Sequence, residues 1–130
     1  MTTKKYKSVE IYDRVCGWWR AHNFPILPIN FLPFEGFIIS NEDTELYAVF
    51  LYVTDSDLCW LTFPVSNPIA SYEEKRGAME QLFQDVGNSA KDAGYNFMFT
   101  TSPLASVQEA LIGAGFTLGD ENVNHYMKLL

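Results

Sequence analysis

Cysteine and histidine are scarce in this chain, which has two of each among its 130 residues. Cys16 and Cys59 both lie inside apolar patterns, so we expect two buried free thiols and no disulfide, because free cysteine packs as a small hydrophobe. His22 and His125 lie far apart in sequence, and neither has a metal-ligand partner at a useful spacing. We therefore expect no metal site.

Basic residues are also few: 9 Lys and Arg stand against 16 Asp and Glu, which gives a formal net charge of −7. They are scattered, apart from Lys4, Lys5 and Lys7 at an N-terminus that we expect to be frayed. Since phosphate backbones are bound by clustered cations, the charge pattern excludes a nucleic-acid-binding surface. No apolar run reaches membrane-spanning length, and residues 1–7 do not have the apolar region of a signal peptide, so we expect none. We expect a cytoplasmic protein without a membrane segment.

What the chain does contain is enough apolar material for one folded domain over residues 1–130. Hydrophobic residues make up 48% of the sequence and aromatic residues 15%. A chain of this length buries a core without help from disulfides or metals. Such a composition excludes intrinsic disorder.

The first half of the sequence predicts a helix followed by an antiparallel meander. The helix runs from Ser8, its expected cap, to about His22. Prolines forbid a regular helix in the apolar segment 23–36, which we expect to flank a cleft. Strands are predicted at 36–40, 46–54 and 58–65, and short polar turns join them as an antiparallel meander.

The second half predicts a crossover and a closing hairpin. One long helix is expected from Ser71 to Ala93, begun by a capping box between Ser71 and Glu74. A strand at 95–101 follows, and a strand, a helix and a strand in succession imply a parallel pair. Ser102 and the proline after it are expected to open the last helix. Strands at 116–118 and 123–130 then close a mixed α/β sheet.

The stretch 58–93 is a candidate anion site, because a strand that leads through a turn into a helix N-terminus gathers free N–H groups and a positive dipole end. The backbone of Ser66, Asn67 and Ser71 supplies candidate donors. A tight turn with a helix cap explains the same residues equally well. Lys75 and Arg76 follow in the second turn of the helix, either as a solvated face or as phosphate contacts.

The order of these elements, with several phrases of the last third, resembles the GNAT superfamily of acyl-CoA N-acyltransferases. The phrases are Ala93-Gly94-Tyr95 before a strand, Gly113-Ala114-Gly115-Phe116 after a short helix, and Tyr126-Met127-Lys128-Leu129 in the final strand. The resemblance implies an α/β GNAT-like fold: a mixed central sheet with an antiparallel N-terminal meander and helices on both faces. It also implies acetyl-CoA or CoA as cofactor.

By the same resemblance, the coenzyme would contact a set of residues around the 58–93 stretch and the last helix: Val65, Ser66, Asn67, Ser71, Lys75, Arg76, Gly77 and Ser102. The sequence departs from the family at three positions. Glu74 stands where the phosphate loop has a cation or an amide, and Met79 where it has a small residue. Leu111 stands where many members carry a tyrosine general acid.

Two functions follow from the resemblance. The first is binding of an acyl-CoA, with transfer of the acyl group to an amine; this transfer needs a base and an acid. Tyr126, Tyr52 and Glu35 are the candidates for those roles, and no spacing selects a pair. The second is a catalytically silent GNAT-like interaction protein, of the small phage type, which modulates a host enzyme or another partner protein. A homodimer is compatible with either function.

Overall fold

The computed structural model describes residues 1–130 and contains one five-stranded sheet in the order β1-β2-β3-β4-β5. The first four strands pair antiparallel, and β5 pairs parallel to β4. Their bounds are β1 Thr2–Lys7, β2 Glu35–Ser40, β3 Glu45–Val53, β4 Leu58–Ser66 and β5 Phe97–Phe99. The antiparallel meander and the parallel pair predicted from the sequence are both confirmed.

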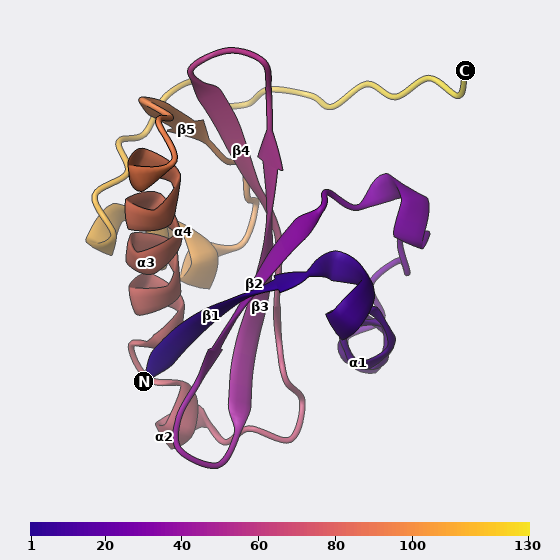
Figure 1. Cartoon of the computed structure of the whole chain (residues 1–130), viewed down its shortest axis with the longest axis vertical. Helices are drawn as coiled ribbons and strands as arrows, with labels where there is room; N and C mark the ends of the chain where they lie inside the picture. The colour runs from indigo at the N-terminus through magenta and orange to yellow at the C-terminus, as the bar shows by residue number, and fades with distance from the viewer.

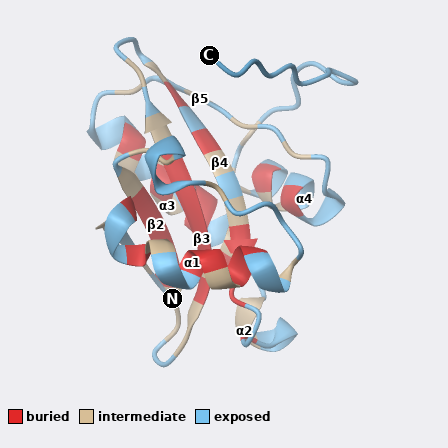
Figure 2. Ribbon diagram, turned by 90° about the vertical axis from the view of Figure 1, so that its right-hand side faces the viewer, coloured by how far each residue is buried: buried red, intermediate tan, exposed pale blue.

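Helices cover both faces of the sheet, as Figure 1 shows. Helix α1 (Ser8–Ala21) lies on one face, while α3 (Ala78–Asp92) and α4 (Ala105–Gly113) lie on the other. Each face has its own cluster of buried side chains, one around Phe50 and Trp19 and one around Val49 and Leu82. The buried segments therefore run through the middle of the sheet and the inner sides of the helices (Figure 2).

The N-terminus is an edge strand, so the expectation of a frayed end is wrong. Residues Thr2–Lys7 pair with β2 along their whole length, from Thr2 opposite Ser40 to Lys7 opposite Glu35. The Thr3 hydroxyl also donates to the Asp85 carboxylate at 2.6 Å, which fastens β1 to α3. These long-range contacts order a segment whose local sequence carries no strong strand signal.

The predicted 71–93 helix is broken into two. Helix α2 (Tyr72–Lys75) ends two residues before Gly77, and Gly77 has the left-handed φ of +73° that only glycine adopts without strain. The capping box is confirmed: Ser71 Oγ accepts from the Glu74 N–H at 3.1 Å, and Glu74 Oε1 accepts from the Ser71 N–H at 3.0 Å. Gly77 therefore starts a second helix, α3, in a new direction.

The last third departs most from expectation. Helix α4 begins at Ala105 and not at Ser102, whose Oγ instead accepts from the Leu104 N–H at 3.2 Å in a local turn. Gly115 ends the helix as predicted, with a φ of +94°. The closing hairpin is absent, and residues 117–130 form no strand. An isolated hairpin is marginal in water unless a sheet edge or core supports it.

Hydrogen bonds from two tyrosine hydroxyls to backbone carbonyl oxygens hold the proline-rich segment, residues 23–36, against the sheet and α1. The Tyr12 hydroxyl donates to the Leu27 carbonyl oxygen at 2.6 Å, and the Tyr52 hydroxyl donates to that of Phe31 at 2.7 Å. A single 3-10 turn, η1 (Ile29–Phe31), is its only regular element. None of the helices in the structure has the length and apolarity that crossing a membrane requires.

Candidate functional site

Strand β4 contains a bulge with strained backbone. Thr62 lies opposite Phe50 and Val65 opposite Ala48, so two residues, Phe63 and Pro64, face the single residue between their partners. Phe63 has a φ of +53°, which is rare for a bulky side chain and marks strain held in place by the surrounding structure. Bulges of this kind bend a strand and often lie beside functional sites.

Beyond Trp60, β4 has no partner on the β5 side. The parallel ladder consists of three pairs, from Leu58 with Phe97 to Trp60 with Phe99, and it stops there. Residues 61–66 of β4 continue for six more positions to Ser66 while the chain after β5 turns toward α4. The two strands therefore separate, and the outer edge of the bulged half of β4 presents unpaired backbone groups.

After β4 ends at Ser66, the chain leads through a turn and α2 to the N-terminus of α3. Gly77 caps the helix without any side-chain hydrogen bond, so the first-turn N–H groups have no internal acceptor. With 15 residues, α3 carries a full helix dipole whose positive end is here. The arrangement suits an anion.

Both departures from the GNAT phosphate loop are turned away from this helix end. The Glu74 carboxylate is occupied by the Ser71 N–H at 3.0 Å and by Asn41 Nδ2 at 3.1 Å. The pKa of Glu74 is accordingly lowered, first by the Ser71 backbone and then by the Asn41 side chain. Met79 packs against the core cluster on the α3 side. Both side chains are thus held by contacts within the fold.

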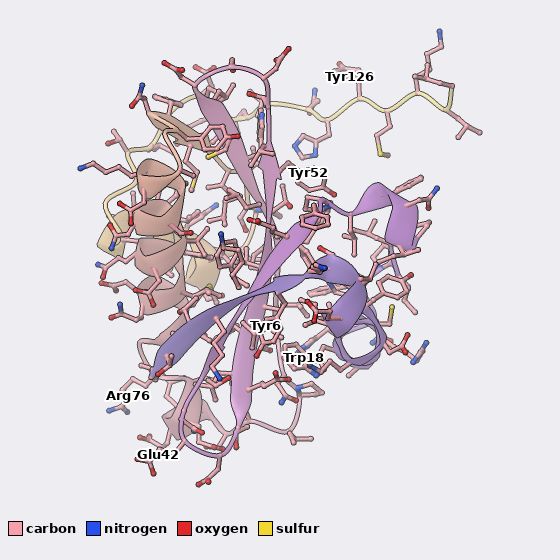
Figure 3. The ribbon with its side chains drawn as sticks, viewed as in Figure 1. Tyr6, Trp18, Glu42, Tyr52, Arg76 and Tyr126 are labelled. Atoms are coloured by element: carbon pink, nitrogen blue, oxygen red, sulfur yellow. The ribbon has the colours of Figure 1, made fainter.

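The cations beside the helix end are exposed. Arg76 follows α2 and pairs with the Glu73 carboxylate at 3.2 Å, with 68% of its side chain exposed. Figure 3 shows it at the molecular surface near α2. Lys75 is the last residue of α2 and is partly buried. Surface ion pairs such as that of Arg76 are weak, so the guanidinium is available to an incoming phosphate.

Most of the predicted turn donors are already used. The Asn67 N–H donates to the Leu46 carbonyl oxygen at 2.9 Å, and Asn67 Nδ2 donates to that of Glu45 at 2.8 Å. Ser71 is occupied by the capping box. Val65 is buried in the α1-side cluster and contributes only backbone. Asn67 and Ser71 thus shape the turn in this structure, and their binding of a coenzyme stays a prediction.

The structure ties Ser66 to a histidine that the sequence left without a role. His22 Nε2 lies 2.9 Å from Ser66 Oγ and 3.1 Å from the Ser66 carbonyl oxygen, and its ring stacks on Phe24. Ser102, at the other side of the site, accepts from Gln108 Nε2 through its carbonyl oxygen at 2.9 Å. Ser66 thus joins the end of β4 to the end of α1, and Ser102 joins the segment before α4 to that helix.

The three acid–base candidates do not come together. Tyr52 and Glu35 lie on opposite faces of the sheet, by the register of β2 with β3. The Glu35 carboxylate pairs with Lys5 at 3.6 Å. Tyr126 is 90% exposed on the C-terminal segment, at the opposite end of the molecule from Arg76 (Figure 3). Glu35 and Tyr52 therefore do not face a common site.

An apolar cavity of about 220 Å³ lies against the β4 bulge. Its lining residues come from α1, the proline-rich segment and the bulge: Trp19, Phe24, Pro25, Leu27, Phe63 and Pro64. Tyr52 adjoins it, with its ring centroid 6.2 Å from that of Phe63, and burial raises the pKa of the Tyr52 phenol. The bulge was not predicted from the sequence, although Pro64 within a strand pattern is a signal for one.

The remaining titratable groups offer no metal site and no reactive thiol. Nowhere do three or more His, Cys, Asp or Glu side chains gather around a position that could hold a metal ion. Cys59 is fully buried, and its burial raises the pKa of its thiol, which keeps the sulfur protonated.

No model of a known protein family matches the chain, and no curated protein sequence matches it. Solved structures do match. A probable acetyltransferase gives a TM-score of 0.72 at 14% identity over 100% of this chain and 99% of that one. An aminoglycoside acetyltransferase from an uncultured soil metagenomic sample, in complex with sisomicin, gives 0.72 at 12% identity over 99% and 96%. The aminoglycoside N-acetyltransferase AAC(6')-Iy, in complex with CoA, gives 0.64 at 15% identity over 98% and 100%.

The chain has a GNAT-like fold. This confirms the fold class that the sequence resemblance implied, including helices on both faces of a mixed sheet. The position at which the resemblance expects a tyrosine acid is Leu111, which is buried in the cluster under α3 and α4. Leu111 is thus a buried aliphatic side chain at the position where the resemblance implies a proton donor.

Proposed function

We propose that this chain binds acetyl-CoA or CoA, with the pyrophosphate at the N-terminus of α3 and the pantetheine arm along the unpaired edge of β4. The observations that carry the proposal are the N-terminus of α3, which has no side-chain cap, and the edge of β4 that is unpaired beyond Trp60. Helix N-termini bind phosphates through free N–H groups and the dipole. A strand edge without a partner has the backbone groups that an amide-containing arm pairs with.

Three residues would assist this binding. Gly77 lets the chain turn at the helix end without a side chain, so that phosphate oxygens reach the N–H groups. Arg76 exchanges its weak surface pair with Glu73 for a phosphate. Lys75 adds a second positive charge at the same turn.

Acyl transfer to an amine is the reaction that this placement supports. The thioester would lie near the β4 bulge, and the apolar part of the acceptor would occupy the cavity between Trp19 and Phe63. The net charge of −7 favours the approach of protonated amines. The Tyr52 ring lies beside the bulge, with its centroid 6.2 Å from that of Phe63, and burial raises the pKa of its phenol. We assign proton donation to Tyr52, whose hydroxyl would have to leave the Phe31 carbonyl oxygen to which it donates at 2.7 Å.

Titration calorimetry with CoA tests the binding step, and we expect saturable heat together with a raised Tm. Gly77→Ala should weaken binding, since it strains the helix end. Gly94→Ala is its matched control, because Gly94 also has a positive φ of +101° and open space around its Cα, but it lies at the far end of α3. No saturable heat from CoA or acetyl-CoA at millimolar concentration would overturn the proposal.

A catalytically silent interaction protein is the second candidate, because Leu111 cannot donate a proton and an aromatic cluster is exposed near β5. The partner would then be a host enzyme or another protein of the cytoplasm. Release of free CoA thiol from acetyl-CoA in the presence of a panel of primary amines separates the two. Release that Tyr52→Phe abolishes supports transfer, whereas binding without release at any acceptor concentration supports the silent protein.

A further inference from the structure

A serine and a histidine from distant parts of the chain form a hydrogen-bonded pair that the proposed transfer to an amine does not use. His22 Nε2 lies 2.9 Å from Ser66 Oγ. This distance is within the range of about 2.6–3.2 Å at which a general base takes the proton of a nucleophile. A serine hydroxyl is a weak nucleophile by itself, and an adjacent imidazole activates it. Both side chains are only partly buried, so the pair is accessible from solvent.

The end of α1 holds the imidazole in place. After His22 the chain turns back, and the Phe24 N–H donates to the Trp19 carbonyl oxygen at 2.9 Å. This turn stacks the Phe24 ring on the imidazole, with 5.5 Å between the ring centroids. With its proton on Nδ1, His22 accepts from the Ser66 hydroxyl through Nε2; with the proton on Nε2, it donates to the Ser66 carbonyl oxygen at 3.1 Å. The first tautomer is the one that acts as a base toward Ser66.

The backbone of Ser66 supplies a hydrogen-bond donor beside its own hydroxyl. The Asn67 N–H donates to the Leu46 carbonyl oxygen, so these two residues form a hydrogen-bonded pair next to β3 and β4. The neighbouring pair, Tyr47 with Ser66, is therefore non-hydrogen-bonded, and the Ser66 N–H and carbonyl oxygen point away from β3. They point to the edge of β4 that has no partner beyond Trp60. An N–H at this place stabilises the negative oxygen that forms when a nucleophile attacks a carbonyl group.

The apolar cavity adjoins both members of the pair. Phe24, which stacks on His22, and Pro64, which lies two residues before Ser66, are among its lining residues. The cavity measures about 220 Å³, which is less than the roughly 300–1,000 Å³ of pockets for drug-sized ligands. A short apolar acyl group fits this cavity in size and polarity.

We propose that Ser66 and His22 are a nucleophile and its base, which together hydrolyse esters of short apolar acids. Ser66 Oγ attacks the ester carbonyl carbon, its proton passes to His22 Nε2, and the alcohol leaves with that proton. Water then attacks the acyl-serine and gives a proton to His22 Nε2, which returns it to Ser66 Oγ as the carboxylic acid leaves. The acyl group would occupy the same cavity as the proposed amine acceptor, but the reaction needs no coenzyme and is independent of the coenzyme site.

Hydrolysis of p-nitrophenyl butyrate in the absence of coenzyme tests the proposal. We expect a burst of about one p-nitrophenolate per chain and then slow turnover, because this leaving group departs faster than water attacks the acyl-serine. Mass spectrometry should find the butyryl group on Ser66. Ser66→Ala should abolish the burst, and Ser106→Ala, at an exposed position of α4, is the matched control that should retain it. A wild type without a burst, or a butyryl group on another residue, would overturn the proposal.

Variants of His22 separate a base from a structural contact. His22→Gln keeps a hydrogen-bonding side chain but cannot take up a proton, so the rate of the burst should fall about 100-fold or more. Added imidazole should restore part of that rate, and circular dichroism checks that the variant is folded. His125→Gln, in the exposed C-terminal segment, is the matched control and should retain the burst. A folded His22→Gln that acylates Ser66 as fast as the wild type would show that the imidazole only joins α1 to β4, and the proposal would then be wrong.

Discussion

The imidazole of His22 and the hydroxyl of Ser66 meet at 2.9 Å across 44 positions of sequence. The same Nε2 lies 3.1 Å from the Ser66 carbonyl oxygen. The contact joins the end of α1 to the end of β4, immediately before the turn that leads to the proposed pyrophosphate site. It therefore fixes the position of the apolar cavity relative to the bulged edge.

His22→Ala should lower the free energy of unfolding by about 1–2 kcal/mol, since it removes a hydrogen bond and the stack on Phe24. Ser66→Ala should cost less, because the carbonyl oxygen of residue 66 still accepts from the imidazole. Urea denaturation of both single variants and the double variant measures the coupling. Fully additive losses would show that the two side chains do not act together.

Gly36→Ala should destabilise the fold by about 1–3 kcal/mol through overpacking. A Cβ on Gly36 would lie 2.9 Å from Ile11 Cδ1 and 3.0 Å from the Phe50 ring, between α1 and the sheet. Gly17→Ala is the matched control, with nothing within 4 Å of its Cβ in the middle of α1. That variant should be more stable than the wild type by up to about 1 kcal/mol, as alanine favours helix. Chemical denaturation compares the two.

The strain at Phe63 can be measured by comparing two replacements that both remove the ring. Phe63→Gly accepts the φ of +53°, whereas Phe63→Val places a β-branched residue in the left-handed region. We expect the glycine variant to be more stable than the valine variant by about 1–2 kcal/mol. Equal unfolding midpoints would mean that the bulge relaxes, and the cavity beside it should then lose its shape.

Acid stability should depend on Glu74. Its pKa is lower in the folded chain than in the unfolded one, chiefly because the Ser71 N–H binds the carboxylate, with help from Asn41. The ionised group therefore stabilises the fold above the unfolded pKa, and this contribution is lost as pH falls through the folded pKa. Glu74→Gln should flatten the acid side of the plot of unfolding free energy against pH. An unchanged slope would contradict the role of the capping box.

Local sequence signals determined much of this protein: the meander, the capping box at Ser71 and the stop at Gly115 depend on residues close together in the chain. The continuous helix over 71–93 was wrong because the apolar pattern runs through Gly77 and does not reveal its left-handed backbone. The same limit hid the bulge at Phe63, which arises from pairing with β3.

Only the tertiary structure decided which site residues meet. The sequence resemblance indicated the region of the proposed coenzyme site. Long-range contacts determine what its side chains bind: Glu74 accepts from Asn41, and Asn67 donates to the Glu45 carbonyl oxygen. Strand β1 forms because it pairs with β2, which lies some thirty residues later in the sequence. The local sequence of β1, with its three lysines, does not predict this pairing. The closing hairpin was also predicted wrongly: the apolar pattern of residues 123–130 favours a strand, but in the structure the segment makes no pairing that would support one.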